Sequence, residues 1–403
     1  MNFDYIFIIN ILQSFVLLIL GLSTLYIFIF SLAGLFYKQI PYPEVTKNRK
    51  IAVLIPGYKE DNVIIEVAKD ALLQDYPRQY YDVVIIADSF RPETLKILKE
   101  LPIVLFEVSF EKSTKSKALN KALELLGNNY EIAVILDADN LMAKDFLTKI
   151  NSAFESNFLA IQGHRQAKNL NTPLALLDAV SEEINNHIFR KGHRVFGLSS
   201  AVIGSGMAFN YSYFKKIMSE VKAIGGFDKE IELKMMKAGN KIEYLDDARI
   251  YDEKVQKAEV FLIQRRRWLS AQFHYFRQDF YDSLKRLILN GNIDYFNKAI
   301  QFIQPPRIML ISLLPVFGGI FIFLDYLLGS SQLYSILWIV VNTLCVVTFL
   351  FSIPTEFYNL KTLGALKSLP KGIMLMFGSL LKIKGANKEF LHTKHDGNTE
   401  YPD

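Results

Sequence analysis

Three long runs of apolar residues stand out along the chain, one near its start and two near its other end. Residues 5–36 carry no charged side chain, and residues 308–329 and 333–353 are almost as apolar. A helix of about 20 apolar residues spans a bilayer core, so each run is long enough to cross a membrane. Residues 330–332 alone separate the last two runs, which predicts a transmembrane hairpin. A buried pair of soluble helices is the alternative, because Asp325 interrupts the first of the two.

Basic residues predict the orientation of these runs. Only Asp4 precedes the first run, whereas four basic residues follow it: Lys38, Lys47, Arg49 and Lys50. Because cytoplasmic loops are enriched in Lys and Arg, we expect residues 38–306 in the cytoplasm and the protein in the cytoplasmic (inner) membrane. Contact with an anionic lipid bilayer explains the net charge of +5, so we infer no nucleic-acid partner. The single cysteine, Cys345, excludes a disulfide framework.

The region after the hairpin contains a fourth, shorter apolar stretch. Lysines flank it on both sides, and residues 372–381 are too few to cross a membrane comfortably. We expect residues 362–383 to form an interfacial helix with a break at Pro370. A further membrane crossing by these residues is the alternative.

Between the first run and the hairpin, short apolar runs alternate with helix-like stretches. The runs are rich in branched residues and cover 51–55, 82–87, 102–107 and 131–136. The helix-like stretches between them cover 60–73, 92–100 and 116–126. This alternation predicts an α/β domain with a doubly wound, mostly parallel sheet. Such sheets bind ligands outside the carboxyl ends of their strands.

Charged residues follow the predicted strands at that edge. Asp88 ends the second strand, and Asp137 and Asp139 follow the fourth. A loop beside them carries Lys115 and Lys117. Two neighbouring carboxylates repel each other unless water, a cation or a proton intervenes, and a solvated turn is the simplest explanation of the pair alone. Taken with the lysines, the pattern favours a phosphorylated ligand held with Mg²⁺ or Mn²⁺, which prefers carboxylate and phosphate oxygens.

Four motifs occur in one order along the chain: AVLIPGYKE (52–60), VVIIADSF (83–90), VILDADN (134–140) and QRRRW (264–268). In this order they resemble the P-x-Y-N-E segment, the uridine-contacting strand end, the D-x-D motif and the Q-x-x-R-W signature of family 2 glycosyltransferases. The resemblance is to the membrane-embedded branch of that family, which includes cellulose, chitin and hyaluronan synthases and has the GT-A fold.

The chain departs from the family pattern at three places. Lys59 replaces the usual Asn, Ala87 to Phe90 replace Asp-Asp-Gly-Ser, and Phe227 replaces the first acid of the E-D motif. The register still places Asp228 on the family's general base. The resemblance further implies a metal ligand in Asp139, nucleotide contacts from Pro56, Glu60, Asp88, Lys115, Lys117 and Asp137, and acceptor or product contacts from Gly204, Ser205, Gly206, Gln264, Arg267 and Trp268.

Several of these residues have plainer interpretations. Glu60 is also expected of a first helical turn, Lys117 of a solvated helix start, and Asp228 of the N-cap of a helix over 229–238. The QRRRW segment is also typical of a basic helix on a bilayer surface, with Arg265 and Arg266 facing lipid. The basic segment 162–169 is expected to border the site, with its histidine a weak metal candidate.

The resemblance implies an inverting, metal-dependent enzyme that uses a nucleotide-sugar donor, UDP-linked by preference. The acceptor is a growing polysaccharide, slightly favoured by Q-x-x-R-W, or a lipid-linked acceptor. Self-association or other membrane subunits are possible partners besides the lipid bilayer, and a non-catalytic nucleotide-sugar-binding subunit is the alternative function. The expected parts are a transmembrane helix (1–37), a GT-A domain (47–250), interface helices (251–304), the hairpin (305–356), an interfacial helix or third span (357–383) and a basic tail (384–403).

Overall fold

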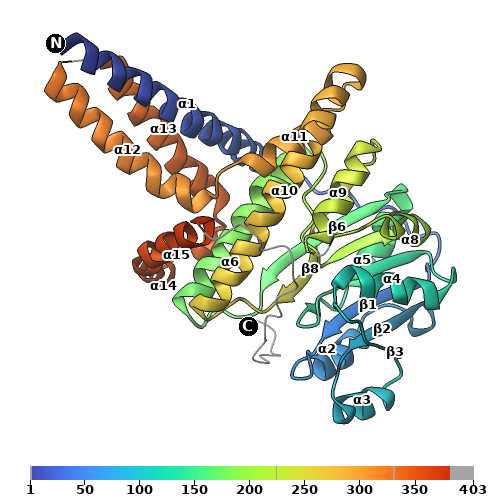
Figure 1. The fold of residues 1–403 in the computed structure, drawn as a ribbon. Helices are drawn as coiled ribbons and strands as arrows, with labels where there is room; N and C mark the ends of the chain where they lie inside the picture. The colour runs from blue at the N-terminus through green and yellow to red at the C-terminus, as the bar shows by residue number, and fades with distance from the viewer. Residues whose placement is uncertain (1, 224, 330–331, 382–403) are drawn as a thin grey trace.

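Three apolar helices pack side by side at one end of the molecule (Figure 1). The computed structural model describes residues 2–223, 225–329 and 332–381. Within them, α1 (Asn2–Gly34), α12 (Arg307–Leu328) and α13 (Gln332–Ser352) are long and apolar enough to cross a membrane by length and composition. We call these helices the apolar bundle. Of the predicted hairpin turn, Gln332 belongs to α13, and residues 330–331 lie outside the described part.

Two short helices follow the apolar bundle. They are α14 (Leu360–Ala365) and α15 (Leu369–Leu381), joined by a 3₁₀ turn at Leu366–Ser368. The predicted break at Pro370 is wrong in position, because Pro370 lies in the first turn of α15, where a missing N–H costs no helical hydrogen bond. With 13 residues, α15 is too short for a span. It packs on α10 and α12 instead, while α14 packs on α6, and the basic tail lies outside the described residues.

The sheet has eight strands in the order β3-β2-β1-β4-β7-β6-β8-β5 within the described part of the chain. As expected, β1 (Ile51–Tyr58), β2 (Tyr81–Asp88), β3 (Val104–Val108) and β4 (Ile132–Ile135) are parallel, with Val53 beside Val83 and Val134. The second half is mixed, because β7 (Met207–Asn210) runs antiparallel to both β4 and β6 (Ala160–Ala167). Beyond it, β8 (Ile242–Asp252) is parallel to β6, and the short β5 (Leu141–Met142) is antiparallel to β8.

Helices cover both faces of the sheet, and alternate residues of β1 show why. Ile51, Val53 and Ile55 enter one core with α2 (Ile64–Ala71), α3 (Pro92–Lys99) and α5 (Phe146–Ala153). Ala52 and Leu54 enter a second core with α4 (Lys115–Leu126), α8 (Tyr211–Ser219) and α9 (Phe227–Lys237). A strand buried on both faces needs a continuous apolar run, which is the pattern predicted for a doubly wound sheet.

Four helical segments lie between the sheet and the apolar bundle (Figure 1). They are α6 (Pro173–Asn185), a π-helix at Asn186–Gly192 that continues into α7 (His193–Val195), the long α10 (Ala258–Asn290) and α11 (Ile293–Ile303). A third core joins the π-helix to α1, where the ring of Phe30 stacks on His193 at 4.0 Å between ring centroids. Short 3₁₀ turns occur at Arg78–Tyr80, Phe154–Ser156 and Thr355–Phe357.

Candidate active site

Two adjoining hollows lie at the carboxyl ends of β1, β2 and β4. The smaller, of about 210 Å³, is lined by carboxylates from several strand ends, and we call it the carboxylate cleft. The larger, of about 830 Å³, extends to the apolar bundle, and we call it the deep cavity. Five residues line both, so the two hollows meet at Lys115, Asp137, Arg165, Gln264 and Arg267.

The ends of β1 and β2 form one wall of the carboxylate cleft. Pro56, Glu60 and Asp88 line it as predicted. The residues after the strand ends have positive φ, 55° at Lys59 and 60° at Ser89. Such backbone is strained for residues other than Gly and easier for Asn, so Lys59 stands where the family's Asn would fit better. The first-turn acid of α2 is Glu66, so a role at the helix start does not explain Glu60.

The Asp137 and Asp139 carboxylates have separate partners, which removes the repulsion expected between them. Asp137 Oδ1 accepts from Lys115 Nζ at 2.5 Å, and that lysine also donates to the carbonyl of Gly204 at 2.7 Å. Asp139, only 4% exposed, accepts from the backbone N–H of Glu253 at 3.1 Å and from the Asn140 amide at 3.2 Å. A solvated turn would leave Asp139 in water, so its burial is at odds with that interpretation.

The carboxylate oxygens of Asp137 and Asp139 suit a divalent cation whose coordination is completed by oxygens of a bound ligand. In the described residues, no three His, Cys, Asp or Glu side chains converge on one metal position. Mg²⁺ and Mn²⁺ commonly take one or two carboxylates and then substrate phosphates, so a shared Asp-X-Asp site is sufficient. Glu253, whose backbone N–H donates to Asp139, has a buried Oε2 without a hydrogen-bond partner among the described residues, which is the kind of oxygen a cation or its water would use.

A buried ionic network that the sequence did not reveal supports this wall. Glu182 Oε2 accepts from Arg165 at 2.8 Å, its other oxygen lies 3.3 Å from Arg190, and Lys254 lies 3.8 Å away. Burial alone would raise the pKa of Glu182, but the three cations hold it well below its ordinary value. The predicted basic segment therefore borders the site through Arg165. Asp252 and Glu253 also line the carboxylate cleft, and Lys254 pairs with Asp252 at 2.8 Å.

His164 in the same segment is not placed as a metal ligand. Its Nε2 lies 3.0 Å from Glu183 Oε1, and its Nδ1 lies 2.9 Å from Asp246 Oδ1. Burial alone would lower the pKa of His164, but the charge of Glu183 and the hydrogen bond to Asp246 raise it to about 9. Both ring nitrogens therefore donate, and the imidazolium ties β6 to α6 and β8.

Asp228 lies in the first turn of α9 and lines the deep cavity. The predicted N-cap role of Asp228 is wrong, because Gly226, at φ 73°, occupies that position. Arg267 on α10 stands near both Asp137 and Asp228: burial lowers its pKa, and the charges of these two carboxylates oppose that shift. Asp228 therefore lies in the deep cavity, near Arg267 at the junction of the two hollows.

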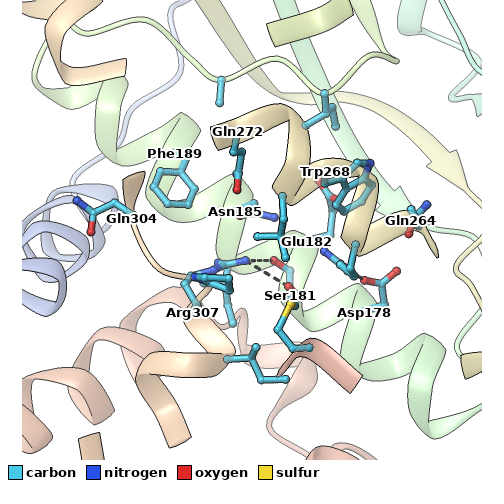
Figure 2. A pocket seen from close by; sticks show the side chains of 18 of the residues that line it. Asp178, Ser181, Glu182, Asn185, Phe189, Gln264, Trp268, Gln272, Gln304 and Arg307 are labelled. Atoms are coloured by element: carbon cyan, nitrogen blue, oxygen red, sulfur yellow. Dashed lines mark hydrogen bonds and ion pairs between the residues drawn. The ribbon is translucent and has the colours of Figure 1, made fainter. Parts of the chain in front are cut away.

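The QRRRW segment forms part of α10 and faces the deep cavity rather than lipid alone. Gln264 and Trp268 line it (Figure 2), and so does Arg267. Arg265 also turns inward, where it pairs with Asp178 and lies 4.5 Å from the centre of the Trp268 ring. The interpretation in which Arg265 faces lipid is therefore wrong.

Three of the predicted site residues do not line either hollow. Lys117 is exposed and donates to the carbonyl of Lys112 at 2.8 Å, while its own N–H is capped by Thr114. Ser205 is fully buried and accepts from the N–H of Asp137 at 3.0 Å, so it positions the Asp-X-Asp turn. A Cβ at Gly206 would lie 2.5 Å from Ile250, so this glycine permits close packing. Of the glycine loop, Gly204 lines the deep cavity.

Comparisons with curated proteins find two enzymes that are similar to part of this sequence. The chain is 31% identical over 145 residues to a beta-monoglucosyldiacylglycerol synthase of Nostoc sp. and 30% identical to the enzyme of that name from Trichormus variabilis; each alignment covers 34% of this chain. The chain matches only about a third of the length of these curated relatives, 30% of each.

A solved structure extends the similarity to most of the fold. The mannosyltransferase PcManGT from Pyrobaculum calidifontis, in complex with GDP-Man and Mn²⁺, superposes with a TM-score of 0.56 at 16% identity and covers 92% of this chain and 97% of its own. At this identity the likeness concerns the fold alone. Residues 48–271 match the family described as "Glycosyltransferase like family 2". Because this match spans more than half of the chain, the protein belongs to the family 2 glycosyltransferases and has their GT-A fold.

Proposed function

We propose that this glycosyltransferase moves a sugar, with inversion, from a UDP-linked donor to an acceptor carried by a membrane lipid. One observation carries the proposal: the deep cavity runs from Asp137 and Asp228 in the catalytic domain to Phe349 and Leu350 on α13 and Met376 on α15. A water-soluble acceptor would not need an apolar passage toward helices that can cross a membrane. A lipid acceptor needs one, because its acyl chains stay in the bilayer while its headgroup enters.

The donor belongs in the carboxylate cleft. Asp88 and Glu60 offer acceptors to the base and ribose, with Pro56 shaping the wall, and Asp137 would contact the ribose or support the cation through water. A divalent cation on Asp139 would neutralise the diphosphate as charge develops on it. Lys115 and Arg267 line the same junction and would compensate the remaining phosphate charge.

Asp228 is the proposed general base. It would take the proton from the acceptor hydroxyl while that oxygen attacks the anomeric carbon from the face opposite the diphosphate. The C–O bond to the diphosphate breaks as the new glycosidic bond forms, so one step inverts the configuration. General-base assistance typically contributes about 10²–10⁴-fold.

Extension of a polysaccharide is the second candidate. It is favoured by Trp268, whose ring lines the deep cavity and offers a face for a sugar. The membrane end of the cavity, walled by Val346, Phe349 and Leu350, favours the lipid acceptor instead. We also propose that the cytoplasmic side of the inner membrane holds the catalytic domain, as basic residues after α1 predict.

The test uses the full-length protein purified in detergent, supplied with Mn²⁺, a mixture of UDP-sugars and a membrane-lipid extract. Wild type should release UDP and form a glycolipid, identified by mass spectrometry, with an anomeric configuration opposite to that of the donor. Asp228→Asn should lower kcat by about 10²–10⁴-fold with UDP affinity unchanged. The matched control is Asp145→Asn, because Asp145 lies outside both hollows and pairs with Lys149 at the surface. If Asp228→Asn keeps a kcat within tenfold of wild type, Asp228 is not the general base. If the product is a polymer that forms without lipid, the enzyme extends a polysaccharide instead.

A further inference from the structure

A half-buried arginine at the membrane end of the deep cavity has no part in the chemistry proposed above. Arg307 is the first residue of α12 and lies among α6, the π-helix and α10 (Figure 2). Its Nη2 donates to the carbonyl and the hydroxyl of Ser181, at 3.0 and 3.2 Å. Its Nη1 is buried and has no hydrogen-bond partner among the described residues. Within the same residues it forms no ion pair with a carboxylate.

The carboxylates nearest to Arg307 are already committed to other cations. Asp178 pairs with Arg265, and Glu182 is shared by Arg165, Arg190 and Lys254. The remaining polar side chains around the guanidinium in Figure 2 are neutral: Ser181, Asn185, Gln272 and Gln304. Arg307 therefore stands in a positively charged part of the cavity that the protein itself does not neutralise.

An arginine in such surroundings is suited to an anion that arrives with a ligand. A guanidinium presents a planar fork of donors that matches phosphate, and a buried charge without a counter-ion is costly. The backbone N–H groups at the start of α12 add positive potential at the same place. Surface lysines would attract any anion, whereas Arg307 is half-buried and lines the cavity.

We propose that Arg307 binds the phosphate of the acceptor lipid, so that the acceptor is an acidic glycerolipid rather than a neutral diacylglycerol. This inference rests on the proposed function, because it names the substrate class of the same cavity. Arg307 on α12 would hold the phosphate, the acyl chains would leave past Phe349 of α13 and Met376 of α15, and the headgroup hydroxyl beyond the phosphate would reach Asp228. The neutral amides of Asn185, Gln272 and Gln304 suit the hydroxyls of such a headgroup.

Binding is tested without turnover, by native mass spectrometry of the full-length protein in detergent. The probes are dioctanoyl-phosphatidylglycerol, which carries phosphate and free hydroxyls, and dioctanoylglycerol, which carries no phosphate. Wild type should bind the phosphate-bearing lipid at least tenfold more tightly. Arg307→Gln should lose that preference, and Arg307→Lys should retain part of it, because a lysine restores the charge but not the fork. The matched control is Arg286→Gln, an exposed arginine of α10 outside both hollows, which should bind both lipids as wild type does.

Further arms separate the possible sources of the phosphate and the two levels of the proposal. Inorganic phosphate at millimolar concentration should not displace the lipid, and UDP affinity should be unchanged in Arg307→Gln. Equal binding of the two lipids by wild type would overturn the inference. A loss of UDP affinity in Arg307→Gln would also overturn it, because Arg307 would then bind the donor. Glycosylation of the neutral lipid, unaffected by Arg307→Gln, would overturn the inference and leave the proposed function standing. Arg307-dependent binding of a lipid that is never glycosylated would support the anion site and overturn the lipid acceptor.

Discussion

Replacing Glu182 with Gln removes the centre of the buried ionic network beside the candidate site. The carboxylate is 7% exposed and holds Arg165, Arg190 and Lys254 within 2.8, 3.3 and 3.8 Å. Glutamine has almost the same shape, so the change removes the charge without making a cavity. Asp252 then remains as a counter-ion for two of the three cations, at 3.5 Å from Arg165 and 2.8 Å from Lys254, whereas Arg190 keeps no carboxylate partner among the described residues.

The size of the effect follows from the partners that remain. Breaking a buried ion pair by removing one partner costs about 3–5 kcal/mol. Asp252 still compensates two of the cations, so we expect the lower end, about 3 kcal/mol. In a cooperative unit of 150–250 residues, each kcal/mol shifts Tm by about 2–4 °C, which gives a loss of about 6–12 °C. At the surface, Glu66→Gln breaks the pair with Lys69 on α2, whose two side chains are half exposed, and should shift Tm by less than about 2 °C.

The measurement is thermal unfolding of the two variants and wild type in one detergent at one scan rate, because unfolding of membrane proteins is commonly irreversible. Mn²⁺ and UDP are left out, so that ligand binding does not mask the change. If Glu182→Gln unfolds within about 2 °C of Glu66→Gln, the network does not stabilise the domain and the reasoning from buried charge is wrong.

Three further predictions follow from other parts of the structure. His164 has a folded-state pKa of about 9 against an unfolded value of 6.5, so its contribution to stability is complete below about pH 6.5 and is lost as pH rises through 9. This contribution is roughly 3 kcal/mol. The Tm of wild type should therefore fall over this pH range, and the plot of Tm against pH should be flatter for His164→Gln. A Cβ at Gly192 would lie 2.1 Å from the carbonyl oxygen of Phe30, so Gly192→Ala should lower Tm by several degrees, whereas Gly319→Ala, with no heavy atom within 4 Å, should not. Calorimetry should show that Mn²⁺ raises the affinity of wild type for UDP, and that in Asp139→Asn this increase is at least tenfold smaller. If the increase is unchanged in the variant, the cation binds elsewhere.

The sequence predicted those features that depend on local pattern. Uninterrupted apolar runs indicated α1, α12 and α13, and branched runs indicated β1 to β4, because span length and strand burial are read from consecutive residues. Asp88, Asp137 and Asp139 were correctly expected at one edge, since parallel strands bring their carboxyl ends together. The mixed half of the sheet was not predicted, because β5 and β7 are two and four residues long and carry too little pattern.

The rest of the site depends on contacts between distant residues. Arg165 meets Glu182 and Asp252 only after β6, α6 and β8 have packed together, and Arg194 meets Glu243 only after α7 has packed on β8. No spacing rule distinguishes such a buried charge from a solvated one. The N-cap of α9 was misplaced for a different reason: Gly226 adopts a left-handed conformation, and the helix therefore starts two residues earlier than the polar side chain of Asp228 suggested.

The deep cavity takes its walls from segments that are made at different times. The ribosome completes the matched domain at residue 271, whereas α13, which supplies Phe349 and Leu350, begins only at Gln332. A nascent chain can therefore assemble its nucleotide half before the far wall of the deep cavity exists. Under the proposed function, insertion of the hairpin would then be the event that shields the reaction from bulk water, and biogenesis itself would delay productive transfer until the chain is anchored beside its lipid acceptor.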